Sequence, residues 1–272
     1  MFTFLLVQAI WNRPRLEIDK GTSTTDFSVG MEPKITLICA TIHLNRLQYI
    51  QDLVKLSRAH PFVENVIIIW NGPDIPEDVS YLASPPKGSQ STVTVVQYDI
   101  NSLNNRFDPY LPIHTEAVMV VDDDLEIFPE TISCAMMSWM SDPSRLYSFG
   151  IGRSVTKVDY KRSAPGDNAT NFYLPRLIFH KEFLDIYFSK KYQRLRNYVD
   201  DHDGHCDDVA FASVVTKHTK KGMVRFNARA KTKNTIDGIS DQSGRRTLRR
   251  ECSRKIISML DWTMPSSDVL KC

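Results

Sequence analysis

The chain has 272 residues, of which 42% are hydrophobic and 24% are charged, and its formal net charge at neutral pH is +2. The length suits one α/β domain, or one domain with a subdomain, and the composition is ordinary for a globular protein. A net charge this small gives no electrostatic reason to expect binding to nucleic acid. Five cysteines are too few for a fold held together by disulfides.

Residues 1–33 are predicted to be a leader or stem that precedes the folded domain. Residues 12–33 are polar and mixed, as flexible segments are. Residues 2–11 (FTFLLVQAIW) are apolar but shorter than the ~18 residues of a membrane helix, and no basic segment precedes them. They are either the stump of an anchor or an N-terminal strand, so membrane association through a short anchor stays open.

From residue 34 onward, short apolar segments alternate with segments of helical periodicity. The strands are expected at Ile35–Thr41, Val66–Trp70, Thr92–Tyr98, Val118–Val121 and Tyr147–Ile151. The helices are expected at Asn45–Ala59, Phe128–Met140, Lys181–Tyr198 and Asp207–Lys217, and residues 160–172 are expected to form a loop. This alternation predicts an α/β fold with a mostly parallel central sheet flanked by helices.

Three consecutive carboxylates, Asp122, Asp123 and Asp124, follow the buried strand that ends at Val121. An open parallel sheet binds ligands beyond the carboxyl ends of its strands. Because neighbouring side chains of an extended segment point to opposite sides, Asp122 and Asp124 are expected to face the same way. Carboxylates so placed suit Mg²⁺ or Mn²⁺ together with a nucleotide diphosphate. The alternative is that Asp124 caps the next helix.

Two further polar segments are candidates for the same site. Residues 101–106 (NSLNNR) offer donors for ribose, base and phosphate, or form a plain polar turn. Residues 205–208 (HCDD) open a predicted helix, where a carboxylate either caps the helix or stabilises charge at a sugar. The spacing of His202, His205 and Cys206 matches no standard zinc site.

A late basic cluster is either a solvated helix face or a site for a phosphate or an acidic glycan. Its members are Arg245, Arg246, Arg249, Arg250, Arg254 and Lys255. Cys39 and Cys134 lie in apolar segments and are expected to be core thiols. Cys206 and Cys252 lie in polar segments and are better candidates for pairing.

Taken together, these segments resemble the exostosin-like glycosyltransferases, glycosyltransferase family 64, which include the C-terminal domain of heparan sulfate polymerases. The resemblance covers roughly residues 34–268. It is carried by the first strand, the Trp70-Asn71 strand end, the segment from Asn101 to Arg106, the aspartate triplet with its strand, and the Cys206-Asp207-Asp208 helix, all in family order.

The resemblance implies a GT-A type nucleotide-sugar-binding fold over residues 34–272, with a nucleotide-binding half at 34–124 and an acceptor and catalytic half at 125–272. It implies nucleotide-sugar binding by Arg46, Asn71, Asn101, Arg106, Asp122 and Asp123, and Mn²⁺ or Mg²⁺ binding by Asp124. It further implies catalytic roles for Asp208 and Arg249 and a disulfide between Cys206 and Cys252.

The reaction implied is retaining transfer of an N-acetylhexosamine from a UDP-sugar to a glycan or glycolipid, in the lumen of the endoplasmic reticulum or Golgi. The alternatives are a glycosphingolipid transferase that uses GDP-mannose or another sugar, and an inactive scaffold. Residues 174–177 (LPRL) replace the family's frequent Gly-Ala, so the acceptor is expected to differ from that of the heparan enzymes. Residues 168–170 (NAT) form a glycosylation sequon.

Overall fold

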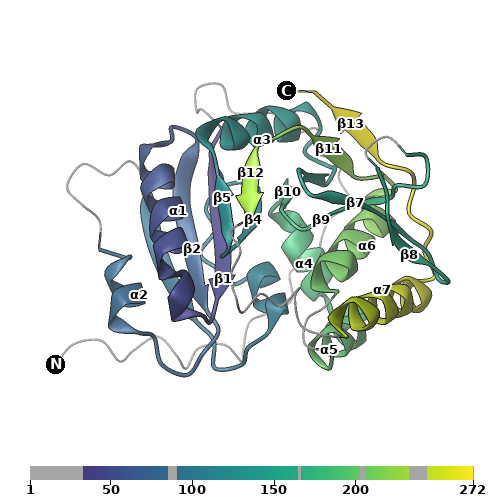
Figure 1. Cartoon of the computed structure of the whole chain (residues 1–272), viewed down its shortest axis with the longest axis horizontal. Coiled ribbons are helices and arrows are strands. Elements are labelled where there is room, and N and C mark those ends of the chain that lie inside the picture. Colours follow the sequence, from purple (N-terminus) through teal and green to yellow (C-terminus); the bar gives the residue numbers. More distant parts are fainter. Residues whose placement is uncertain (1–32, 85–90, 165–166, 203–205, 233–243, 272) are drawn as a thin grey trace, which may run out of the picture. The chain divides into compact units, whose positions relative to one another are not determined.

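A computed structural model describes residues 33–84, 91–164, 167–202, 206–232 and 244–271 (Figure 1). All but the last residue of the expected leader, residues 1–33, lie outside this part. The folded unit is Glu32–Cys272. Its division into a nucleotide-binding half and an acceptor half stays a prediction.

The centre of the unit is an eight-stranded sheet in the order β13-β11-β6-β10-β4-β1-β2-β3. The strands are β1 (Ile35–Thr41), β2 (Val63–Trp70), β3 (Thr92–Gln97), β4 (Ala117–Asp122), β6 (Tyr147–Ser148), β10 (Leu177–His180), β11 (Val224–Phe226) and β13 (Asp268–Leu270). Within this sheet only β10 runs antiparallel to its neighbours. The predicted α/β fold with a mostly parallel sheet is confirmed.

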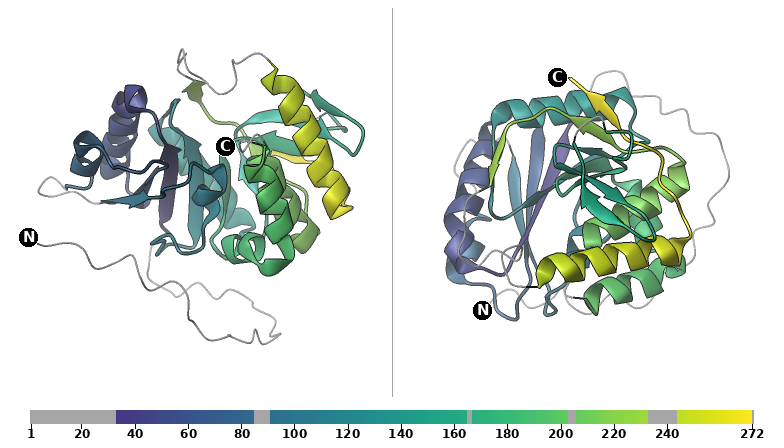
Figure 2. Two further views of the ribbon diagram at one scale, coloured as in Figure 1. Left: turned by 90° about the horizontal axis from the view of Figure 1, so that it is seen from below. Right: turned by 45° about the vertical axis from the view of Figure 1, so that its right-hand side comes forward.

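Helices cover both faces of the sheet, as the two views of Figure 2 show. The α1 (Leu47–Ala59) and α3 (Pro129–Ser141) helices pack on one face. The opposite face carries α4 (Glu182–Phe188), α5 (Gln193–Asp200), α6 (Asp207–Thr219) and α7 (Arg245–Leu260). Strand residues alternate between these layers, since Leu37 and Cys39 of β1 face α1 and Ile38 faces α6. Burial on both faces explains the unbroken apolar strands.

Short elements complete the unit. They are the helices η1 (Leu44–Arg46), α2 (Glu77–Tyr81), η2 (Leu103–Phe107) and η3 (Lys190–Tyr192), a β5 (Leu125–Ile127) and β12 (Ala230–Thr232) pair, and a small sheet of β7 (Ile151–Val155), β8 (Tyr160–Arg162) and β9 (Phe172–Leu174). The last three correct two expectations, because residues 160–172 are not simply a loop and Tyr147–Ile151 is not one strand. At Gly150 the chain passes so close to β9 that a Cβ atom would lie 2.5 Å from the Leu174 carbonyl oxygen.

The predicted helix Lys181–Tyr198 is also interrupted. It consists of α4, η3 and α5, and the break falls at Ser189, whose ψ of 152° is extended. The Ser189 hydroxyl donates to the Ile186 carbonyl, which satisfies an acceptor at the end of α4. The helical periodicity across this segment is therefore real, but it belongs to separate helices.

Cysteine pairing is partly as expected. Cys206 and Cys252 form a disulfide that joins the start of α6 to α7, as the resemblance implied. Cys39 is a buried free thiol, whereas Cys134 is disulfide-bonded, so the expectation of a core thiol at Cys134 is wrong. In the described ranges no helix has both the length and the apolar character that crossing a membrane requires.

Candidate active site

The aspartate triplet lies where β4 ends, at the edge of the sheet at which its parallel strands finish. Asp123 points into the protein, where it accepts a 2.7 Å hydrogen bond from the Thr41 hydroxyl and pairs with Arg46. Asp122 and Asp124 remain partly exposed. This is the alternation that the sequence predicted. Since β5 follows the triplet and α3 begins only at Pro129, the alternative that Asp124 caps a helix is wrong.

Arg106 connects the triplet to the start of α6. Its guanidinium donates to Asp207 through Nε, at 2.7 Å, and through Nη2, while Nη1 lies 3.3 Å from an Asp122 oxygen. Burial lowers the pKa of Arg106, but Asp207 and Asp122 more than offset this and hold it above the usual value. For the Asp207 carboxyl, burial has the opposite effect and raises the pKa, although the charge of Arg106 acts to lower it. Arg106 thus fixes two separate acidic segments with one side chain.

Asp208 and Arg249 form the second ion pair of the site. Arg249 Nη2 lies 2.8 Å from Asp208 Oδ2, and the side chains are 34% and 1% exposed, respectively. The other oxygen of Asp208 accepts a 2.8 Å hydrogen bond from the Val209 amide. The charge of Asp208 raises the pKa of Arg249 despite burial. The Cys206–Cys252 disulfide lies beside this pair and ties the two helices that carry it.

The polar segment before β4 is held in place from two sides. Asn71 donates from its side chain to the Ser102 carbonyl at 3.2 Å and accepts from Asn105 at 2.8 Å. Asp200 of α5 accepts from Asn104 at 2.8 Å and from the Ser102 hydroxyl. Both amide atoms of Asn71 are thereby used within the protein. The structure places Asn71 as an anchor of η2, and its contact with a nucleotide stays a prediction, as does that of the exposed Asn101.

Arg176 is a further cation at the site. It follows Pro175 with a φ of 71°, a conformation that non-glycine residues rarely adopt and that often marks functional positions. Its guanidinium lies 5.5 Å from the Phe149 ring centre and donates at 3.0 Å to Thr232, which is in β12 beside β5. Burial lowers the pKa of Arg176, while Asp122 and Asp124 raise it. The segment that departs from the family therefore lies next to the triplet.

Among the described residues, the carboxylates of the site outnumber its arginines, even with Arg176 included. Five carboxylates gather here, and three arginines form ion pairs with them: Arg46 with Asp123, Arg106 with Asp122 and Asp207, and Arg249 with Asp208. Asp124 forms no ion pair in the described part of the chain. Its pKa is raised to about 6, first by burial and then by the charges of Asp122 and Asp123.

This donor set fits a hard divalent cation in one particular way. Unbalanced carboxylates are the oxygen ligands that Mg²⁺ and Mn²⁺ prefer. Yet the described residues contain no group of three or more His, Cys, Asp or Glu side chains able to enclose a metal ion. Mg²⁺ is commonly held by one or two carboxylates together with waters and substrate phosphates, so this donor set is compatible with a cation bound beside a nucleotide diphosphate. Cys206 is in a disulfide and is not a zinc ligand.

Sequence reasoning found most of these residues but missed some partners. The sequence marks Asp207 only as part of the Cys-Asp-Asp motif, although it is the main partner of Arg106. Thr41 and Asp200, which hold Asp123 and η2, carried no signal beyond being polar. Arg46 and Asp123 are 5% and 8% exposed and pair with one another, so their contacts with a nucleotide sugar stay predictions.

A parallel α/β sheet with an aspartate triplet at the end of a central strand, and a second acidic helix start beside it, is the arrangement of a GT-A type glycosyltransferase. A sequence model described as "Glycosyl transferase family 64 domain" matches residues 35–268. The chain therefore belongs to glycosyltransferase family 64.

Several relatives with recorded names support this assignment. Human Exostosin-2 is 29% identical over 75% of this chain, and human Exostosin-like 2 is 25% identical over 90%. The Glycosylinositol phosphorylceramide mannosyl transferase 1 of Arabidopsis thaliana is 23% identical over 94%. The matches span 29%, 76% and 80% of these relatives, respectively, so the chain corresponds to only part of Exostosin-2.

Proposed function

We propose that this protein transfers an N-acetylhexosamine from a UDP-sugar to a glycan or glycolipid acceptor, with retention of anomeric configuration and with the aid of Mn²⁺ or Mg²⁺. The observation that carries the proposal is the meeting of the aspartate triplet with the Asp208–Arg249 pair through Arg106. That arrangement combines a place for a metal-bound diphosphate with an anion and a cation for the reacting sugar.

In this proposal Asp124, with Asp122 beside it, would hold the divalent cation. The cation would neutralise negative charge on the diphosphate as the bond to the sugar breaks. Asp123 acts indirectly, because its hydrogen bonds with Thr41 and Arg46 fix the backbone that carries its two neighbours. Arg106 supports the arrangement by keeping Asp122 and Asp207 in one position each.

Asp208 and Arg249 would act on opposite sides of the breaking bond. Both oxygens of Asp208 are engaged, one by Arg249 and one by the Val209 amide. A carboxylate held in this way is a weak nucleophile but a good electrostatic partner for positive charge that develops on the sugar. Arg249 is more exposed than Asp208, so its other guanidinium nitrogens would bind the leaving diphosphate while Nη2 stays with Asp208. We therefore favour charge stabilisation by Asp208, with the acceptor entering from the same face as the leaving group.

The first experiment measures release of sugar from UDP-N-acetylglucosamine and UDP-N-acetylgalactosamine, with Mn²⁺ and with a chelator. Asp208→Asn removes charge from the reacting centre and is expected to lower the rate by roughly 10²–10³-fold, as removal of a preorganised electrostatic group does in other enzymes. Asp124→Asn should abolish the response to Mn²⁺. Asp74→Asn is the matched control, because Asp74 is exposed in the loop after β2.

Sugar release that is indifferent to the chelator, and equal in Asp124→Asn and Asp74→Asn, would contradict the proposed metal role. No release from any nucleotide sugar, combined with nucleotide binding, would favour an inactive scaffold. Both outcomes are distinguishable from misfolding by comparing the thermal unfolding of each variant with that of the parent protein.

A second donor is worth testing beside UDP-sugars. The Arabidopsis relative is named as a mannosyl transferase and matches 94% of this chain, so GDP-mannose is the alternative donor. Thermal shifts with UDP and with GDP, each with Mn²⁺, compare the two nucleotides directly, because a ligand that binds the folded state raises the melting temperature. A larger shift with GDP would replace UDP in the proposal.

The proposal extends to the class of acceptor and to the cellular compartment. Arg176 beside the triplet adds bulk and charge where the acceptor must approach, which favours an acceptor different from that of the heparan enzymes. A lumenal location in the endoplasmic reticulum or Golgi is supported by the Cys206–Cys252 disulfide, since such bonds persist in oxidising compartments. It is also supported by the sequon, whose Asn168 is exposed.

A further inference from the structure

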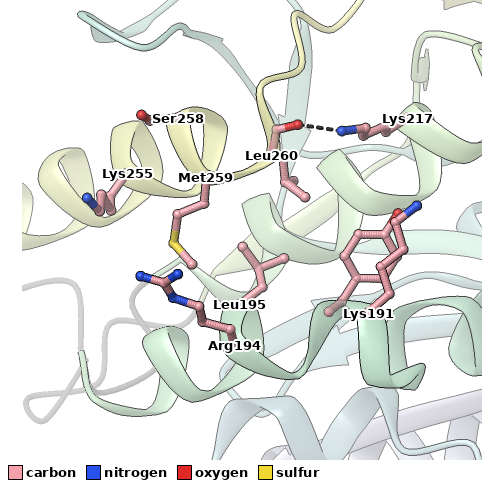
Figure 3. Close-up of a pocket in the computed structure, with 9 residues that line it drawn as sticks. Lys191, Arg194, Leu195, Lys217, Lys255, Ser258, Met259 and Leu260 are labelled. Atoms are coloured by element: carbon pink, nitrogen blue, oxygen red, sulfur yellow. Dashed lines mark hydrogen bonds between the residues drawn. The ribbon is translucent and has the colours of Figure 1, made fainter.

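A cavity of about 450 Å³ lies between η3, α5, α6 and α7. Figure 3 shows Arg194 and Leu195 on α5 opposite Met259 on α7, with Lys255 one turn away. Leu195 and Met259 give the cavity an apolar floor. A space of this size is within the range of small-molecule sites.

All the charged side chains that line the cavity in the described part of the chain are positive. Lys191, Arg194, Lys217 and Lys255 line it, and no acidic side chain does so among the described residues. Lys217 donates to the Leu260 carbonyl at the end of α7. Lys191 lies 5.2 Å from the centre of the Tyr192 ring. Arg194 and Lys255 form neither an ion pair nor a hydrogen bond with any described residue, so their donors are available to a ligand.

The position of Arg194 is unfavourable for the helix that carries it. It is the second residue of α5, and the first turn of that helix has no acidic residue. The N-terminus of a helix carries partial positive charge, so a cation there destabilises the helix slightly. Lys190 and Lys191 add two more cations just before the helix begins. Stability of α5 does not explain this concentration of charge, whereas binding of an anion does.

This cavity is separate from the candidate active site. Lys217 is nine residues along α6 from Asp208, which corresponds to about 13 Å of helix. Lys255 is six residues along α7 from Arg249, or about 9 Å. The basic cluster of the sequence is thereby divided between two places, since Arg249 pairs with Asp208 and Lys255 faces the cavity.

We propose that the cavity binds a phosphate ester, with the phosphate between Arg194 and Lys255 and the organic part against Leu195 and Met259. Arginine recognises phosphate through paired donors, and lysine adds charge. The apolar floor suits the carbon skeleton of the ester rather than a free inorganic ion. The phosphate belongs either to a soluble metabolite or to a lipid headgroup, and the experiment below separates these sources.

The probe is glycerol 3-phosphate, with glycerol as its uncharged counterpart. Protein labelled with ¹³C at the methionine methyl groups reports binding at Met259, whose signal is assigned with Met259→Leu. We expect glycerol 3-phosphate to shift this signal and glycerol to leave it unchanged. The double variant Arg194→Glu/Lys255→Glu should weaken binding by at least about tenfold, the usual loss for hydrogen bonds to a charged group. Added salt should weaken it too.

The matched control is Lys55→Glu/Lys271→Glu, which changes the net charge equally at two exposed lysines outside the cavity. Arg194→Glu places an acid at a helix N-terminus, so it should raise thermal stability while it reduces binding. A lipid source is tested by sedimentation with phosphatidylcholine vesicles, with and without phosphatidic acid. Binding only to the acidic vesicles would identify a lipid headgroup, and binding only to glycerol 3-phosphate a soluble ester.

The proposal is wrong if neither probe binds, or if the charge-reversed protein and the control bind equally well. An intact Met259 signal shift in Arg194→Glu/Lys255→Glu would likewise refute it. The variant Arg194→Lys keeps the charge but loses the paired donors, so its affinity should lie between that of the parent protein and that of the double variant. These outcomes do not depend on the proposed transfer reaction, because no measurement requires a nucleotide sugar.

Discussion

Replacing Arg106 by methionine tests the central link of the site. Methionine retains much of the arginine stem but removes all the hydrogen bonds to Asp207 and Asp122. Asp207 is 2% exposed, so its carboxylate would stay buried without its guanidinium partner. Removing one member of a buried ion pair typically costs about 3–5 kcal/mol. That is a large part of the ~5–15 kcal/mol by which domains are stable.

The cost should depend on pH in a defined direction. Burial already raises the pKa of Asp207, and loss of Arg106 would raise it further. A carboxyl whose folded pKa exceeds its unfolded value stabilises the protein below the unfolded pKa, and this stability is lost as pH rises through the folded pKa. The Arg106→Met variant should therefore be less impaired at pH 5 than at pH 8, because Asp207 can take up a proton at the lower pH.

Urea unfolding of the variant and the parent protein at both pH values measures these effects. Arg162→Met is the control, because Arg162 is exposed in β8 and should cost less than about 0.5 kcal/mol. The double variant Arg106→Met/Asp207→Leu removes both charges, so it should recover much of the loss. A cost below about 1 kcal/mol for Arg106→Met, or a double variant as unstable as the sum of its single changes, would refute the reasoning.

Three other outcomes are expected. Cys206→Ser/Cys252→Ser removes a disulfide between cysteines that are 46 residues apart. Loop-closure entropy predicts that this lowers the free energy of unfolding by about 4 kcal/mol. Urea unfolding measures the loss, and an unchanged midpoint would contradict the prediction. Burial lowers the pKa of His60 in the folded protein. The contribution of neutral His60 to the free energy of unfolding is therefore fully present above the unfolded pKa of about 6.5. It decreases as the pH falls below that value, by at most ~1.4 kcal/mol per pH unit. His60→Gln should remove this part of the pH dependence, measured as urea midpoints from pH 7 to pH 5. Asn168 is exposed on a turn, so protein secreted from a eukaryotic host should carry a glycan there that peptide mass mapping detects and Asn168→Gln eliminates.

The central strands were predictable because their environment is simple. β1, β2 and β4 are buried on both faces, so continuous apolar segments such as Ile35–Thr41 have no other good placement. The position of the acidic residues at the edge of the sheet was predictable for the same reason. A buried apolar strand ends where the next polar side chains reach solvent. Family order then linked Asp122–Asp124 to Asp208 and Arg249, which lie far apart in sequence.

What was missed depends on long-range packing that no local pattern encodes. β5 and β12 are three residues long, and each exists because the other pairs with it. The strand after Tyr147 breaks where Gly150 lets the backbone meet the Leu174–Pro175 segment. Arg176 lies in this same segment and has a positive φ, which the local sequence Leu174–Leu177 does not indicate because it contains neither glycine nor asparagine. The roles of Asn71 and Asp200 likewise depend on where η2 packs.

The site is arranged at a cost to the stability of the protein without ligand. A sequence selected only for stability would place amides or apolar groups where Asp124 stands, because a partly buried carboxylate beside two others is disfavoured, as its raised pKa indicates. The neighbouring carboxylates differ from Asp124, because Asp123, Asp207 and Asp208 each form an ion pair with an arginine. The unpaired charge is thus confined to the partly exposed edge where a ligand can reach it. Binding of a divalent cation at this edge would offset the excess negative charge and would thereby stabilise the folded protein.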